Sequence, residues 1–138
     1  MVVRAEVIRR RLERLDEYLD FLEQMRAYDE REFLADPEHY GSAERFLQLA
    51  IEALLDMGSH IIADEGLGSV NQSRDVPRLF REHGYIDEAL EERWIRMIGF
   101  RNILVHAYLD VDRRQVYRIL HEGLSDLRAL QRVFTGFL

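Results

Sequence analysis

The 138-residue sequence contains no cysteine and no lysine, and it has only two prolines. Without cysteine the chain forms no disulfide and offers no thiolate ligand to a metal. Two prolines leave most of the chain free to form helices, because proline is the residue that disrupts a helix most strongly. No uninterrupted apolar run approaches the roughly 20 residues of a membrane helix, and the charged N-terminus has no signal-peptide apolar segment. These absences favour a cytoplasmic protein that does not interact with a membrane.

Acidic residues outnumber basic residues in this sequence. All 19 basic residues are arginines, and the formal net charge is −7. An acidic chain is unsuited to broad, non-specific nucleic-acid binding, which needs cationic surface to displace counterions, although a local cationic cleft remains open. The N-terminal cluster is either a solvated helix face or a surface that contacts RNA or an acidic partner. It comprises Arg4, Arg9, Arg10, Arg11 and Arg14.

Apolar residues at helical spacing predict an all-α protein with a single domain, residues 1–138. The first predicted helix covers residues 3–34, and its apolar seam would pack lengthwise against another helix. The seam comprises Ile8, Leu12, Leu15, Leu19 and Leu22. A break is predicted at residues 36–41, which include a proline and a glycine. The second helix is predicted to follow Ser42 as its N-cap and to reach about Asp64.

The second half of the chain predicts three more helices. A short one covers residues 77–83 and stops at a glycine. The next has Asp87 as its N-cap and runs to about His106. The last starts after Asp112, which has capping-box spacing to Gln115, and runs nearly to the C-terminus. Together the elements predict an up-down four-helix bundle with a short extra helix.

The fourth predicted helix, residues 87–106, carries polar residues along rows of its surface that are otherwise apolar. Arg101 follows Trp94 and Met97 in one line, and a second line contains Ile95, Gly99, Asn102 and His106. If these lines face the core, the polar groups need partners, because an unpartnered buried polar group costs a few kcal/mol. The side chains of Arg101, Asn102, His106 and Tyr108 span an arc of about 160° around the helix axis. They would therefore line one concave surface. An alternative from the spacing alone is a helix end whose polar side chains cap carbonyls and pair with nearby acids such as Asp110.

Arg101, His106 and Tyr108 stand in the spacing Arg-x4-His-x-Tyr, with Asn102 directly after the arginine. This segment resembles the motif of HepT-like proteins in the HEPN superfamily. Flanking segments resemble that family in the same order, and the likeness covers residues 5–133. These flanks are residues 50–53, 60–63, 66–68, 99–100 and 109–112.

The resemblance implies a HEPN-like bundle that acts as the toxin of a type VII-like toxin–antitoxin system. Its activity would be metal-independent endoribonuclease cleavage of RNA, without a cofactor, at a composite site in a homodimer interface. Arg101 and His106 would be catalytic, with Asn102 in support. A minimal nucleotidyltransferase antitoxin would neutralise the toxin by transferring AMP to Tyr108.

These residue types suit that chemistry. RNA can cleave itself when a 2′-hydroxyl attacks the adjacent phosphate, so the protein needs to supply only an acid, a base and positive charge. Imidazole exchanges protons near neutral pH, and guanidinium holds phosphate oxygens through paired hydrogen bonds. Asn102 would orient the His106 imidazole or contact the phosphate. One chain has one motif histidine, so two copies about a twofold axis would supply both acid and base.

The sequence alone allows other interpretations. The chain could be a non-catalytic helical subunit that presents substrate to a nucleotidyltransferase, since related bundles serve in that role. It could also be a purely structural dimerisation bundle, which would leave the polar residues of residues 87–106 unexplained. Tyr108 could be an ordinary core aromatic. No pair among the other histidines has a convincing metal-ligand setting, so no catalytic metal is predicted.

Overall fold

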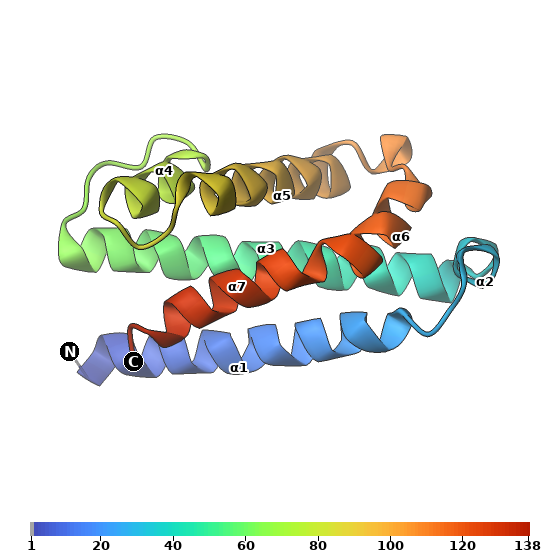
Figure 1. The fold of residues 1–138 in the computed structure, drawn as a ribbon, viewed down its shortest axis with the longest axis horizontal. Coiled ribbons are helices and arrows are strands. Elements are labelled where there is room, and N and C mark those ends of the chain that lie inside the picture. Colours follow the sequence, from blue (N-terminus) through green and yellow to red (C-terminus); the bar gives the residue numbers. More distant parts are fainter. Residues whose placement is uncertain (1) are drawn as a thin grey trace.

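Four long helical segments alternate in direction along the chain (Figure 1). In this computed structural model, backbone is described for residues 2–138 and side chains for residues 5–138. The long segments are α1 (Val2–Met25), α3 (Pro37–Glu65), α5 (Glu88–His106) and the pair α6 (Arg113–Glu122) and α7 (Leu124–Thr135). The short elements are α2 (Glu30–Ala35), α4 (Asp75–Glu82) and the 3-10 turn η1 (Tyr108–Asp110). Every regular element within residues 2–138 is helical, which confirms the all-α, up-down prediction.

The first helix ends earlier than the apolar seam predicted. The whole seam from Ile8 to Leu22 is buried, but the predicted single helix over residues 3–34 is wrong, because α1 stops at Met25 and α2 starts at Glu30. The new start is set by a capping box. The Asp29 carboxylate accepts the Glu32 backbone N–H at 2.8 Å, and the Glu32 carboxylate accepts the Asp29 N–H at 3.2 Å. Local hydrogen bonding therefore interrupts a pattern that periodicity alone would continue.

The helix α3 also begins earlier than predicted. Its N-cap is Asp36, whose side chain accepts the Glu38 backbone N–H at 2.9 Å, so Ser42 is an interior residue and not the cap. Pro37 occupies the first turn, where its missing N–H has no helical partner to lose. The predicted end is confirmed, since Gly66 closes the helix in the left-handed conformation with φ 62°.

The helices α5 and α6 begin where the sequence predicts. Asp87 caps α5 through the Leu90 N–H, and Asp112 caps α6 through the Arg114 N–H, with no capping box to Gln115 in the described residues. The short helix α4 covers Asp75–Glu82 and not residues 77–83. The predicted single last helix is wrong, because Gly123 separates α6 from α7. A Cβ at Gly123 would lie 2.8 Å from the Met97 side chain, so α5 packs directly onto this bend.

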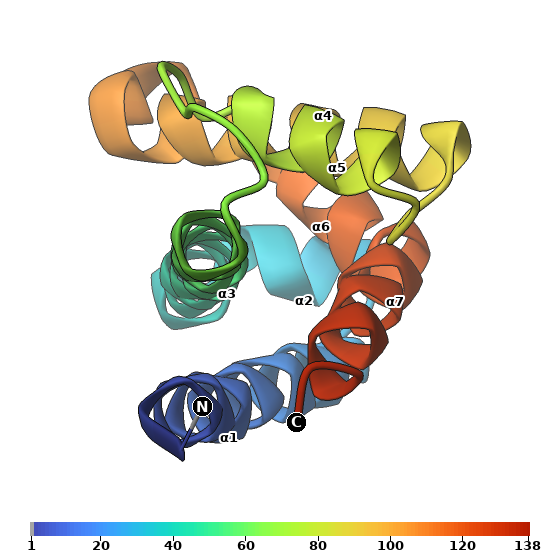
Figure 2. The ribbon, with the colours of Figure 1, turned by 90° about the vertical axis from the view of Figure 1, so that its left-hand side faces the viewer.

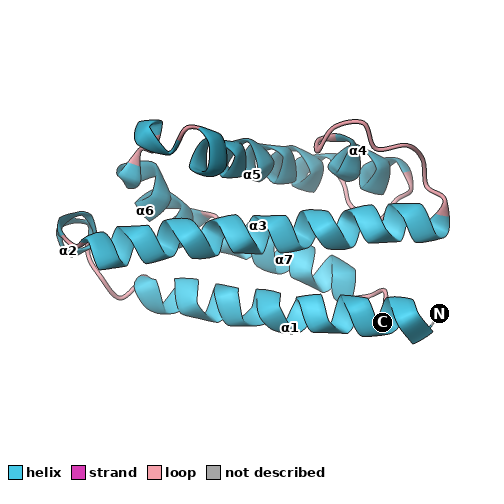
Figure 3. Ribbon diagram, turned by 180° about the vertical axis from the view of Figure 1, so that it is seen from behind, coloured by secondary structure: helices cyan, strands magenta, loops and turns pink. Residues whose placement is uncertain are grey.

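Figures 2 and 3 show how the long helices are arranged. The helix α3 lies between α1 and α5, and these three form one face of the molecule, with α7 behind them. The N-terminal part of α1 and the C-terminal end of α7 lie at the same end of the bundle (Figure 1). A segment of α3 is long and apolar enough to cross a membrane by length and composition alone, with two interrupting acids, Glu52 and Asp56. Half of it is buried inside the protein, as in the core helix of a soluble protein.

A single arginine ties α7 to the acidic side of α1. The Arg128 guanidinium donates to Asp16 and Asp20 at 2.7 Å each and to Glu23 at 2.9 Å. The Arg128 side chain is only 19% exposed, and its pKa is raised, first by the Glu23 hydrogen bond. Hydrogen bonds from Gln131 and Arg128 lower the pKa of the Asp16 carboxyl. This part of the acidic face of α1 is therefore an ion-pair network.

The close approach of α3 to its neighbours depends on Gly58. A Cβ at this position would lie 2.5 Å from Val76 Cγ1 and 3.4 Å from the Trp94 ring. Both neighbours are buried, so Gly58 lets α4 and α5 pack against the backbone of α3.

The Gly58→Ala variant should be less stable by about 1–3 kcal/mol, because overpacking a dense core forces neighbours out of their preferred positions. The matched control is Gly41→Ala in the same helix, where a Cβ meets nothing within 4 Å. Alanine should stabilise that site by about 0.5–1 kcal/mol, since glycine loses more backbone entropy on folding. Urea unfolding followed by circular dichroism measures both changes. Equal stability of the two variants would contradict this account of α3 packing.

Candidate functional site at the end of helix α5

The segment Arg101–Tyr108 lies where α5 ends and the backbone turns into η1. The helix is anchored by Trp94, Met97 and Leu104, all buried against α3, α4 and α7. The helix ends at Ala107, whose φ of −134° is outside the helical range, although its N–H still bonds to Ile103 O. His106 is therefore the last helical residue, and Tyr108 begins the following turn. A rigid helix presents the motif at an exposed end.

The two rows of motif residues on α5 differ in their exposure to solvent. Gly99, Asn102 and His106 are exposed to solvent, so of the arrangements that the sequence allows, their line does not face the core. Ile95 is partly buried at the edge of the same line. Arg101 is the motif residue that turns inward, with a side chain that is 24% exposed. The exposed line needs no partner within the protomer, which leaves it available to another molecule.

Arg101 is held by a short polar chain that runs from α3 to α5. Its Nε donates to Glu52 Oε1 at 3.3 Å, and its Nη1 donates to Asn102 Oδ1 at 2.9 Å. Gln48 Nε2 donates to the same Glu52 oxygen at 3.1 Å. These bonds fix the guanidinium plane, and Nη2 has no partner among the described residues. The arrangement leaves N–H donors for an anion such as phosphate.

Glu52 is a site residue that the sequence reasoning did not assign. Glu52 lies in one of the flanking segments that resemble the HepT-like family, but the resemblance gave it no functional role. A usable signal was present, because Gln48, Glu52 and Asp56 repeat every four residues on an otherwise apolar helix. Only the packing of α3 against α5 shows that Glu52 faces Arg101.

The Asn102 side-chain oxygen accepts a hydrogen bond from Arg101, whereas the family resemblance predicts contact with the His106 imidazole or the phosphate. No hydrogen bond joins Asn102 to His106 among the described residues. His106 follows Arg101 by five residues, which places the two side chains about 140° apart around the helix axis. One protomer therefore directs Arg101 toward α3 and His106 toward solvent.

Tyr108 is 70% exposed, so its interpretation as a core aromatic is wrong. It borders a pocket of about 290 Å³ between the first half of α3 and the start of α6, together with Glu44, Arg45 and Arg113. Burial raises the pKa of the Glu44 carboxyl, and the charge of Arg113 opposes this shift. The Arg113 guanidinium lies 4.1 Å from the Tyr40 ring centroid. An exposed hydroxyl thus lies beside a pocket that contains two arginines.

Three of the other four histidines have local roles outside the motif. His39 stacks on Tyr28 with ring centroids 3.7 Å apart, and His83 Nε2 lies 2.9 Å from Leu67 O. His121 packs against Tyr117 with ring centroids 4.3 Å apart. His60 is half-buried on α3 and makes no hydrogen bond among the described residues. Within residues 5–138 no three histidines or acids gather closely enough to hold a metal ion.

Comparison with known proteins places these features in a family. The family model described as Ribonuclease HepT-like matches residues 9–133. The mRNA nuclease HepT of Shewanella oneidensis is 32% identical over 80 residues, which cover 58% of this chain and 60% of that protein. The tRNA nuclease HepT of Aphanizomenon flos-aquae is 26% identical over 132 residues, which cover 96% of this chain and 90% of that protein. The chain thus spans about three fifths of the first relative and nine tenths of the second.

Solved structures agree with the sequence comparison. The tri-AMPylated Shewanella oneidensis HEPN toxin, in complex with MNT antitoxin, superposes with a TM-score of 0.87 at 25% identity and covers 94% of this chain and 97% of its own. A toxin–antitoxin structure with AMP-PNP superposes with a TM-score of 0.83 at 25% identity and covers 93% of this chain and 97% of its own. The helical arrangement around the motif is therefore that of HEPN toxins.

Proposed function

The chain belongs to the ribonuclease HepT-like family, and from that membership we propose that it is the endoribonuclease toxin of a toxin–antitoxin pair. The observation that carries the proposal is the motif at the end of α5, where Arg101 is oriented by Glu52 while His106 and Tyr108 are exposed. We expect residues 1–138 to act as one domain in the cytoplasm.

The proposed reaction is cleavage of RNA by its own 2′-hydroxyl. One His106 imidazole removes the 2′-hydroxyl proton, the 2′-oxygen bonds to phosphorus, and the bond to the 5′-oxygen breaks. A second, protonated imidazole gives a proton to the leaving 5′-oxygen. The products are a 2′,3′-cyclic phosphate and a 5′-hydroxyl. Arg101 stabilises the extra negative charge on the phosphate during the reaction, and Asn102 holds the guanidinium in place.

Both imidazoles are available only in a homodimer, because each chain has one motif histidine. The exposed surface around the motif suits such an interface. Ile103 is 39% exposed and Leu109 is 86% exposed, and each lies three residues from His106 in the sequence. Gly99 leaves open space within 4 Å of its missing Cβ on the same helix, so a second backbone can approach there. The proposed interface is centred on Gly99, Ile103 and His106.

A Gly99→Glu variant tests this interface without disturbing the protomer. A Cβ at this exposed position meets nothing within 4 Å, so the variant should fold normally but place two carboxylates at the twofold contact. We expect a monomer in sedimentation analysis and loss of RNA cleavage. The matched control is Ala89→Glu, an exposed position on the same helix, which should stay dimeric and active. A dimeric, fully active Gly99→Glu protein would place the interface elsewhere.

The family comparison also suggests the control of the toxin. The Shewanella oneidensis toxin is tri-AMPylated and bound to its MNT antitoxin. For this chain we propose a nucleotidyltransferase partner that joins AMP to Tyr108. The Tyr108 oxygen would attack the α-phosphorus of ATP, and pyrophosphate would leave. The added phosphate would lie near Arg45 and Arg113, which line the adjacent pocket.

Expression of the chain alone distinguishes the proposal from its alternative. A ribonuclease toxin should arrest growth and degrade RNA when produced without a partner. A non-catalytic subunit that presents substrate to a nucleotidyltransferase should do neither, even at equal expression. The comparisons do not favour that alternative, because the curated relatives are named as nucleases.

A further inference from the structure

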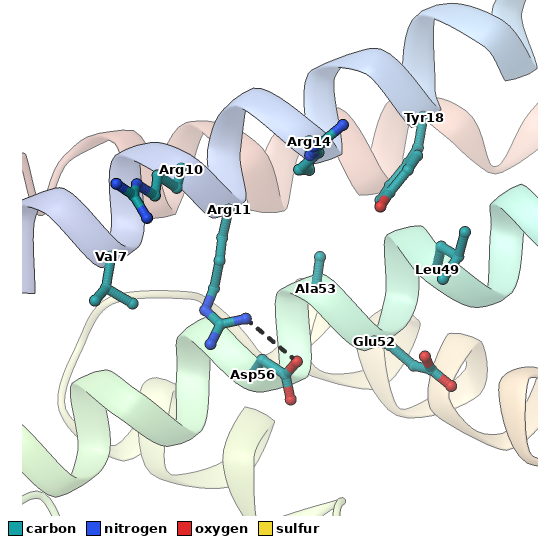
Figure 4. A pocket seen from close by; sticks show the side chains of 9 residues that line it. All are labelled: Val7, Arg10, Arg11, Arg14, Tyr18, Leu49, Glu52, Ala53 and Asp56. Carbon is teal, nitrogen blue, oxygen red and sulfur yellow. Dashed lines mark ion pairs between the residues drawn. The ribbon is translucent and has the colours of Figure 1, made fainter.

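A groove of about 410 Å³ separates α1 from α3 (Figure 4), and two of its lining residues, Glu52 and Asp56, also line the pocket that contains Arg101. We call it the arginine groove. Arg10, Arg11, Arg14 and Tyr18 line its α1 side, and Leu49 and Ala53 line its α3 side. Cations and an aromatic ring thus lie along the α1 side, while the α3 side carries small or apolar side chains together with the acids Glu52 and Asp56 (Figure 4).

The sequence places these residues together through helical spacing. Arg10, Arg14 and Tyr18 are four residues apart, so they lie on one face of α1. That face borders the buried seam at Leu15, which holds α1 against α3. The three arginines belong to the N-terminal cluster seen in the sequence. The side chain of Arg4 lies outside the described residues.

One of the three groove arginines is unpaired among the described residues, and the other two form only exposed ion pairs. Arg10 makes no ion pair among the described residues, and Arg14 pairs only with Glu17, through side chains that are 71% and 65% exposed. Arg11 lies 3.6 Å from Asp56 with side chains 44% and 62% exposed (Figure 4). Ion pairs this exposed contribute at most about 1 kcal/mol and exchange readily. A phosphate can therefore replace them at small cost, in a chain whose net charge is −7.

The groove continues into the Arg101 site across α3. Glu52 and Asp56 line both the arginine groove and the neighbouring pocket that contains Arg101. The two acids are one helical turn apart, so their Cβ atoms are separated by about 6 Å. Glu52 bonds Arg101 on one side of α3, and Asp56 pairs with Arg11 on the other. A strand lying across this part of α3 would meet Arg101 and Arg11 in succession.

We propose that the arginine groove binds the sugar–phosphate backbone of the RNA substrate on one side of the cleaved bond. This inference rests on the proposed ribonuclease function. Arg10 and Arg14 hold successive phosphates through paired N–H donors, and the Tyr18 ring and the apolar floor receive a base. The aromatic ring and the neighbouring apolar side chains favour a single RNA strand over an acidic protein surface. The groove thus sets the position of the strand, while Arg101 and His106 act on the scissile phosphate.

The test compares two double variants of the full chain. Arg10→Gln with Arg14→Gln removes two groove charges, and Arg26→Gln with Arg31→Gln removes two charges elsewhere. Arg26 and Arg31 are exposed, and Arg26 lies about 24 Å along α1 from Arg10. The probe is a single-stranded RNA with 2′-O-methyl groups throughout, which cannot be cleaved. Affinity is measured over a series of salt concentrations, and sedimentation checks the oligomeric state.

The groove variant should bind the probe more weakly, and its salt dependence should fall. Each lost phosphate contact on a single strand lowers the slope of log affinity against log salt by about 0.7, so two contacts lower it by about 1.4. With cleavable RNA, the concentration for half-maximal rate should rise more than the maximal rate falls. The Arg26, Arg31 control should match the wild type. Arg10→Lys with Arg14→Lys should restore most of the salt slope.

Three results would overturn the proposal. Equal slopes in the groove variant and the control would mean that no phosphate lies in the groove. Unchanged RNA binding with lost binding of the nucleotidyltransferase partner would assign the groove to that protein. A groove variant that becomes monomeric would assign it to the dimer interface. A wild-type protein that neither binds nor cleaves RNA would overturn the ribonuclease function itself, a failure distinct from these three.

Discussion

Replacement of His106 by alanine should lower the rate of RNA cleavage by about 10²–10⁴-fold, the range typical of a lost general acid or base. In the proposed dimer the substitution removes both imidazoles, so the upper part of that range is expected. The side chain is exposed at the last residue of α5 and makes no hydrogen bond among the described residues. Its loss should therefore leave the stability of the protomer almost unchanged.

The control for this variant is His83→Ala, which removes an exposed imidazole outside the motif together with its 2.9 Å contact with Leu67 O, so the stability of both variants is measured too. Both proteins are compared with wild type by initial rates on one labelled RNA, after sedimentation shows that each is dimeric. Expression in cells provides a second measurement, since His106→Ala should no longer arrest growth. Cleavage at the wild-type rate by a dimeric His106→Ala protein would show that another residue transfers the proton.

Replacement of Tyr108 by phenylalanine should make the toxin resistant to its partner. The variant keeps the ring but lacks the oxygen that would accept AMP, so growth arrest should persist when the nucleotidyltransferase is produced together with the toxin. Wild-type protein from the same cells should gain about 329 Da for each added AMP, and the variant should gain nothing. The exposure of Tyr108, 70%, makes its hydroxyl accessible to an enzyme.

Tyr85 provides a matched control for this experiment. It is 39% exposed and lies far from the motif in the sequence, so Tyr85→Phe should be silenced and modified like the wild type. Silencing of Tyr108→Phe without any gain in mass would indicate that the partner acts by binding alone. A gain in mass on the Tyr108→Phe protein would place the modification on another residue.

Local signals in the sequence predict some helix boundaries correctly. Other boundaries carry an equally clear signal but differ from the prediction. Asp87 and Gly66 act through short-range hydrogen bonding and backbone conformation, and both ends were predicted. Asp29 and Glu32 carry an equally clear capping box, but the apolar seam of residues 8–22 suggested a continuous helix through it. Pro37 was interpreted as a break, although proline is favoured in the first turn of a helix.

Contacts between helices determine two features that the sequence alone does not predict. Met97 from another helix packs closely against the bend at Gly123, and the orientation of Arg101 depends on Glu52 in α3. Both pairs of residues are far apart in the sequence, so no local pattern shows that they touch. The motif spacing placed Arg101 and His106 on one helix, but only the structure shows that one faces α3 and the other faces solvent. The proposed composite site rests on that divergence.

The most direct measurement is the identity of the RNA ends that purified wild-type protein produces in the presence of EDTA. We predict cleavage without metal, with a 2′,3′-cyclic phosphate on one product and a 5′-hydroxyl on the other. An RNA with 2′-O-methyl groups should remain intact, because it lacks the attacking hydroxyl. Loss of activity in EDTA, or products with a 5′-phosphate and a 3′-hydroxyl, would contradict transesterification at Arg101 and His106.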